Sequence, residues 1–122
     1  MRSEVSEMAG GHLFIRIDFR TGHSIGPDKI KLLEAIGSAR SITGAARLIG
    51  MSYSRAWWLV EEINRSLREP AVTTGIGGVG GGHAVVTPVG RRVVGLYHAI
   101  ELQARTAVEG ECRAIGELVR QE

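Results

Sequence analysis

The sequence predicts an α+β fold that is mainly helical and carries a small β-sheet, and three observations lead to this prediction. Two short helical segments meet at Gly50, a glycine-rich segment lies between two short apolar strands over 71–86, and a long segment with a helical apolar stripe follows Pro88. A chain of 122 residues with 43% hydrophobic residues can bury one modest core, so we expect a single folding unit.

The first predicted element is a strand, followed by a helix. Residues 13–20 alternate in polarity with a period of two, which is typical of a half-buried strand. One face of this strand is formed by Leu13, Ile15, Ile17 and Phe19. After the turn-like residues 21–24, Pro27 opens a helix that ends near Gly37, because proline fits the first helical turn. The apolar stripe of this helix consists of Ile30, Leu32, Leu33 and Ile36.

Two capped helices follow and are joined by a sharp turn. Ser41 caps a short helix that Gly50 stops, and Ser52 caps a second helix that Pro70 ends. The buried side of the short helix is expected to be Ala45, Ala46, Leu48 and Ile49. The stripe of the second helix is Ala56, Leu59, Val60, Ile63 and Leu67. Small residues at the helix contact and a glycine in the turn are typical of a helix-turn-helix.

A hairpin and a long helix complete the prediction. Residues 71–73 and 84–86 read as strands around the glycine-rich loop Gly75–Gly82, and Thr87 with Pro88 begins the last helix. This helix has an apolar stripe and is expected to bend or break at Gly110. The stripe is Val89, Val93, Leu96, Tyr97, Ile100, Ala104, Ala107 and Val108. The element order is that of a winged helix-turn-helix with a helical C-terminal segment.

Charge distribution favours a nucleic-acid partner, although the net charge is only +2. Between Ser38 and Arg92 there are seven arginines against three glutamates, and arginine suits both phosphate and guanine. Arginine bias across a GC-rich genome is the alternative reading. The single cysteine, Cys112, predicts neither a disulfide framework nor a metal site. Without a signal peptide in 1–12 or a long apolar run, we expect a cytoplasmic protein that does not contact membranes and needs no cofactor.

The capped start of the helix after Ser52 is the predicted DNA-reading element, because this part of a helix-turn-helix enters the major groove. Arg55 is the candidate for a guanine contact, and Ser52, Tyr53 and Ser54 can donate to phosphate or base acceptors. Trp58 is expected on the outer face, where DNA sugars, a thymine methyl group or the hairpin are its alternative partners. Trp57 is expected to pack against the hairpin.

The glycine-rich loop is predicted to contact the DNA backbone through its main-chain N–H groups, with Gly78, Gly80 and Gly81 as candidates. His83 at the base of the loop is a candidate phosphate contact at low pH, and an uninvolved surface histidine is the alternative. A nucleotide site is not expected, because neither Lys-Ser/Thr nor a helix follows the glycines. The alternative for the whole loop is a hairpin tip that contacts nothing.

Three segments resemble the N-terminal DNA-binding domain of the ModE-type molybdate-responsive regulators, which is related to the LysR winged helix. They are Met51–Asn64, Gly77–Thr87 and Gly90–Tyr97, within a resemblance that runs from about Leu13 to Ala107. The resemblance implies transcriptional control of molybdate-uptake operons, with DNA contacts at Ser52–Arg55 and Gly75–His83. Trp58 departs from the family, where an acidic residue is usual. The molybdate-holding domains of the family have no counterpart in the sequence, so molybdate binding by this chain is not expected.

The leading hypothesis is a homodimeric, sequence-specific transcriptional regulator. It has a flexible segment over 1–12, a DNA-binding domain over 13–87 and a dimerisation segment over 88–122. Its two reading helices would lie about 34 Å apart on double-stranded DNA, at an inverted-repeat operator. The alternative is a protein-interaction module that uses Trp57 and Trp58 on the same scaffold. Catalysis is not predicted, because the four histidines show no spacing that assembles a nucleophile with its base.

Overall fold

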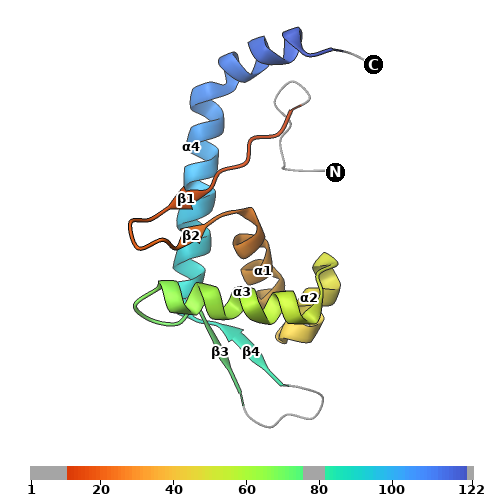
Figure 1. Cartoon of the computed structure of the whole chain (residues 1–122), viewed down its shortest axis with the longest axis vertical. Coiled ribbons are helices and arrows are strands. Elements are labelled where there is room, and N and C mark those ends of the chain that lie inside the picture. Colours follow the sequence, from red (N-terminus) through yellow and green to blue (C-terminus); the bar gives the residue numbers. More distant parts are fainter. Residues whose placement is uncertain (1–10, 76–81, 121–122) are drawn as a thin grey trace.

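The computed structural model describes residues 11–75 and 82–120 and confirms a mainly helical chain with small antiparallel sheets. Figure 1 shows helix α4 running along the molecule, with α1, α2 and α3 beside its first half and a hairpin projecting at that end. The helices are α1 (Pro27–Ala39), α2 (Ile42–Ile49), α3 (Tyr53–Ser66) and α4 (Pro88–Leu118). The strands are β1 (Ile17–Asp18), β2 (Ser24–Ile25), β3 (Val72–Thr74) and β4 (Ala84–Val86).

Side-chain caps start three of the four helices, as the sequence predicts. Each cap oxygen accepts a hydrogen bond from the backbone N–H three residues later, at 2.9–3.2 Å, and so satisfies an N–H that the helix leaves free. The caps are Ser41 for α2, Ser52 for α3 and Thr87 for α4. Gly50 ends α2 in the left-handed conformation, at φ 66°, and this turn directs α3 away from α2.

The main core lies between α1, α2, α3 and the β3–β4 hairpin. The largest side chains buried there are Leu32, Leu33, Ile36 and Ile63. The expectation for Leu48 is wrong, because 63% of its surface is exposed. The buried stripe of α2 instead begins at Ile42 and continues through Ala45 and Ala46, with Ile49 partly buried. Leu48 lies outside that stripe, because successive residues of a helix are rotated by about 100° and Leu48 is therefore displaced around the helix from Ile49.

The N-terminal strand is shorter than predicted. Only Ile17–Asp18 pairs, and its partner is β2, where the sequence suggested a turn. The chain reverses at Phe19, whose backbone exchanges hydrogen bonds with Gly22 and His23, and Gly22 has a φ of 95°. The reversal leaves Phe19 47% exposed and ends the alternating burial of residues 13–18.

Two helix ends and one internal break also differ from the predictions. Helix α1 continues past Gly37 to Ala39, and α3 ends at Ser66, well before Pro70, because Leu67 adopts an extended conformation. Helix α4 is continuous through Gly110, so the predicted break is absent, although Figure 1 shows its C-terminal turns bending. Strand β4 matches its predicted bounds, and β3 lies one residue later than predicted.

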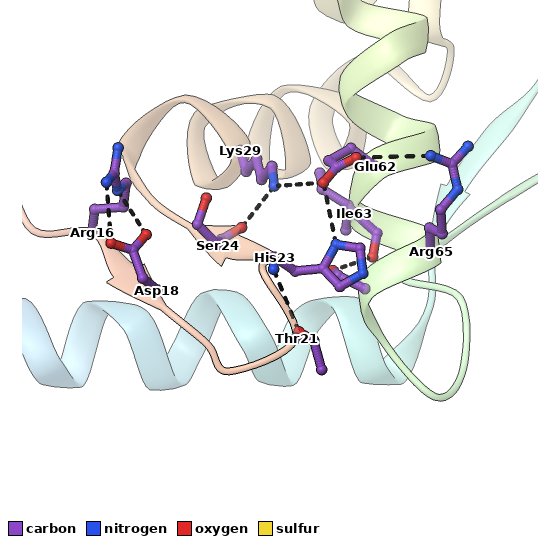
Figure 2. Close-up of polar contacts among 10 residues, drawn as sticks. Arg16, Asp18, Thr21, His23, Ser24, Lys29, Glu62, Ile63 and Arg65 are labelled. Carbon is purple, nitrogen blue, oxygen red and sulfur yellow. Dashed lines mark hydrogen bonds and ion pairs between the residues drawn. The ribbon is translucent and has the colours of Figure 1, made fainter.

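Polar contacts attach the N-terminal ribbon, β1 and β2, to the helices (Figure 2). The carboxylate of Glu62 on α3 lies 3.2 Å from His23 Nδ1, 4.0 Å from Lys29 Nζ and 3.8 Å from Arg65 Nη1. Lys29 is buried, and its ammonium donates to the carbonyl oxygen of Ser24 at 2.7 Å. The buried cation is therefore hydrogen-bonded and faces an acid, as burial of a charge requires.

Helix α4 is joined to the rest of the molecule by two further polar links. The Tyr97 hydroxyl donates to the carbonyl oxygen of Ile15 at 2.6 Å, and burial raises the pKa of this phenol. His98 lies between Glu34 on α1, at 2.6 Å, and Glu101, at 2.8 Å. The hydrogen bond with Glu34 raises the pKa of His98, which favours the charged imidazolium and hence an ion pair between α1 and α4.

Candidate nucleic-acid interface

The capped start of α3, from Ser52 to Arg55, faces outward. Ser52, Tyr53, Ser54 and Arg55 are all exposed, while Ala56 and the buried stripe that follows it face the core. The orientation follows from Gly50 and the Ser52 cap, which start the helix at the surface. The residues that the sequence predicts to touch DNA are therefore accessible from one side.

The two tryptophans have different environments. Trp58 is 56% exposed and lies one turn after Ser54 on the outer face of α3. Trp57 is partly buried and packs against the core, and its ring meets that of Tyr53 edge to face at a centroid distance of 6.3 Å. The exposed indole of Trp58 therefore offers an apolar surface beside the polar start of α3.

A hollow separates α3 from the base of the hairpin. Tyr53 and Trp57 line it from α3, Thr43 from α2, and Thr74 and His83 from the hairpin. The fold thus brings His83 to the same concave surface as Tyr53, although they are thirty positions apart. The candidates Gly78, Gly80 and Gly81 lie outside the described residues.

Arg55 has a partner that sequence reasoning missed. Its Nη2 donates to Asp28 Oδ2, in the first turn of α1, at 3.1 Å. Both side chains are at least half exposed, and an exposed ion pair of this kind contributes at most about 1 kcal/mol. Arg55 can therefore exchange Asp28 for another acceptor at small cost. No local signal reveals this pair, because its members belong to different helices.

Asn64 holds the hairpin against α3. Its Oδ1 accepts from the backbone N–H groups of Ala71 and Val72, at 2.8 and 3.1 Å, and its Nδ2 donates to the Val72 carbonyl oxygen at 2.9 Å. One amide side chain on the inner part of α3 thereby satisfies three main-chain groups where β3 begins. These three bonds attach the start of β3 to α3.

The described part of the chain offers neither a metal site nor a membrane-spanning helix. Within residues 11–75 and 82–120, no cluster of three or more histidine, cysteine or acidic residues has the geometry to hold a metal ion. The helices described there include none whose length and apolar character suit a lipid bilayer.

Comparison with known proteins places the similarity among molybdenum-related proteins. The chain is 46% identical over 82 residues to the molybdenum-pterin-binding protein MopB of Rhodobacter capsulatus, which is 67% of this chain and 30% of that protein. It is 36% identical over 93 residues to the molybdenum transport protein ModE of Azotobacter vinelandii, or 76% of this chain and 34% of that protein. No protein-family model matches the chain.

A third relative is named for an activity on DNA. The chain is 39% identical over 71 residues to the DNA-binding transcriptional dual regulator ModE of Escherichia coli (strain K12), which is 58% of this chain and 27% of that protein. The chain thus spans about a third or less of the length of these three relatives. Their names describe molybdenum binding, molybdenum transport and transcriptional regulation, and none of the three names describes an enzyme.

Proposed function

We propose that this chain is a sequence-specific DNA-binding transcriptional regulator with a winged helix-turn-helix fold. The observation that supports the proposal most directly is the outward-facing first turn of α3 beside the β3–β4 hairpin. In this assignment α2, Gly50 and α3 form the helix-turn-helix, and the hairpin is the wing. The similarity to a protein named as a DNA-binding regulator agrees with it, and the names of the relatives suggest molybdenum-related target genes.

The proposed roles follow from chemistry and position. Arg55 would leave Asp28 and bind a guanine through its planar donor fork, and Ser52, Tyr53 and Ser54 would contact phosphates or base edges. Trp58 would cover the sugars or a thymine methyl group next to that base. His83 would reach a phosphate beside the hollow. The loop amides of Gly78, Gly80 and Gly81 would contact the same backbone strand.

The test of this proposal is Arg55→Ala, measured by fluorescence anisotropy on the duplex that the wild-type chain selects from a random pool. We expect binding of that duplex to weaken by about 1–3 kcal/mol and the preference at one base pair to relax. Asp28→Asn is the matched control, because it removes the other member of the pair and keeps Arg55. This control should bind as tightly as the wild type, or more tightly.

Salt dependence separates DNA binding from the protein-interaction alternative. A duplex held by several phosphate contacts should lose affinity steeply between low and moderate salt. If Arg55→Ala weakened the binding of all duplexes equally, Arg55 would be assigned as a phosphate contact. A wild-type chain with no salt-dependent affinity for any duplex would refute the proposal. It would favour the alternative of a protein-interaction module that uses Trp57 and Trp58.

The second part of the proposal is a homodimer formed through α4. The predicted stripe of α4 is only partly covered within the chain, since 51% of Leu96 and 39% of Ile100 remain exposed. Together with Phe19, Ile17 and Leu67 they line an apolar groove. A second copy of α4 would cover these side chains and place two α3 helices on an inverted repeat.

Leu96→Glu is therefore expected to convert the dimer into a monomer, because it places a charge in the apolar contact. Sedimentation equilibrium measures the change. Gln103→Glu, which adds the same charge at an exposed polar position of α4, is the control and should remain dimeric. A wild-type monomer, or a dimer that survives Leu96→Glu, would contradict this assignment.

A further inference from the structure

The turn between α1 and α2 is occupied by a residue that does not suit its backbone. Arg40 has φ 62° and ψ 21°, in the left-handed region, and it is the only non-glycine residue with a positive φ within the described ranges. This conformation costs free energy for any residue with a Cβ, and glycine adopts it without that cost. On local grounds alone, glycine would be the better residue at position 40.

The main chain of Arg40 explains why the turn exists but not why arginine occupies it. Its N–H donates to the Ile36 carbonyl oxygen at 2.8 Å, and its carbonyl oxygen accepts from the Ala84 N–H at 3.0 Å. The second bond joins the turn to the first residue of β4, where the chain leaves the glycine-rich loop. Both bonds use only backbone atoms, so glycine would form them equally well.

The side chain of Arg40 is available for a ligand. It is exposed, and its guanidinium makes no hydrogen bond or ion pair within residues 11–75 and 82–120. It lines a groove together with His83 and Arg91, over apolar side chains that include Val85 and Val94. The one acid in the lining is Glu34, which already bonds to His98. The groove therefore presents uncompensated positive charge.

This groove continues the surface of the candidate interface. His83 and Ala84 line both the hollow beside Tyr53 and the groove that contains Arg40, so the two meet at the base of the hairpin. An anion that runs past α3 and the base of the hairpin would reach Arg40 next. A DNA strand is such an anion, because it carries a phosphate at every nucleotide.

We propose that Arg40 binds a backbone phosphate of DNA and extends the interface beyond the hairpin. This contact would account for an arginine at a strained backbone position that glycine would adopt without cost. The proposal rests on the DNA-binding function proposed above. It adds a contact that positions the protein on the duplex without reading sequence, since phosphates are the same at every base pair.

Arg40→Gly tests the proposal because it separates folding from binding. Removing the strain should leave the thermal unfolding midpoint unchanged or raise it by about 2–5 °C. The same variant should bind a mixed-sequence fluorescent duplex about three- to tenfold more weakly at moderate salt, and the slope of log affinity against log salt should become shallower by about 1. Arg40→Lys, which keeps the charge, should retain most of the affinity.

Arg120→Ala serves as the control, because it removes an equal charge from the exposed end of the chain beyond α4 and should change neither the midpoint nor the slope. An Arg40→Gly variant with wild-type affinity and slope would overturn the role of Arg40 while leaving the proposed function intact. Failure of the wild-type chain to bind the duplex would overturn both, and the two failures are distinguishable in one titration series.

Discussion

Replacing Gly90 by alanine is expected to destabilise the fold by about 1–3 kcal/mol, although alanine normally favours a helix. A Cβ at this position would lie 2.5 Å from the Ala71 carbonyl oxygen and 2.7 Å from Val86 Cγ1. The first contact is with backbone, so the hairpin and the start of α4 must move apart. The Thr87 N–H bond to that same carbonyl, at 2.9 Å, should weaken with the movement.

Gly95→Ala is the matched control on the same helix. A Cβ at Gly95 meets nothing within 4 Å, so this substitution should stabilise the protein by about 0.5–1 kcal/mol. Urea unfolding of both variants at one protein concentration measures the difference, because dimerisation would make the midpoint depend on concentration. Equal stability of the two variants would show that the contact at Gly90 relaxes freely.

The second large effect is expected for Asn64→Ala, which should cost about 2–4 kcal/mol of folding free energy. The substitution leaves the N–H groups of Ala71 and Val72 and the carbonyl oxygen of Val72 without their partner, and each unsatisfied buried group costs about 1–3 kcal/mol. Water reaching part of this site reduces the sum. Urea unfolding gives the loss in free energy.

Asn64→Asp separates the two ends of the side chain. It keeps the oxygen that accepts from Ala71 and Val72, but it places a carboxylate oxygen where the amide nitrogen donates to the Val72 carbonyl oxygen. Because two acceptors then face each other in a partly buried site, its cost should equal or exceed that of Asn64→Ala. If both variants unfold at the wild-type urea concentration, Asn64 does not hold the hairpin. A duplex titration of Asn64→Asp below its unfolding transition would show whether the hairpin angle affects binding.

Local signals predicted most of the fold. Ser41, Ser52 and Thr87 cap the helices that the sequence assigned to them, and Gly50 turns the chain where expected. These features depend on neighbours within a few positions, and so they can be read from the chain alone. The bounds of β4 follow equally from its local apolar run.

The features that the sequence did not predict depend on residues far apart in the chain. Strand β2 forms only because β1 folds back on it at Phe19, and Leu48 is exposed because the short α2 buries Ile42 instead. Contacts between distant segments also explain why the sequence did not predict Asp28 and Arg40 at the candidate interface. Asp28 and Arg40 come close to the predicted site through the packing of α1 against α2, α3 and β4, which no periodicity in their own segments records.

The Asp28–Arg55 pair would introduce a competition into the proposed DNA complex. In the free protein Asp28 is hydrogen-bonded to the guanidinium, so a DNA base would have to displace this carboxylate. A base that offers two well-placed acceptors would displace it, whereas a base that offers none would leave Arg55 paired with Asp28 and a carboxylate close to the phosphates. This competition would lower the affinity slightly for every duplex and most for a mismatched one.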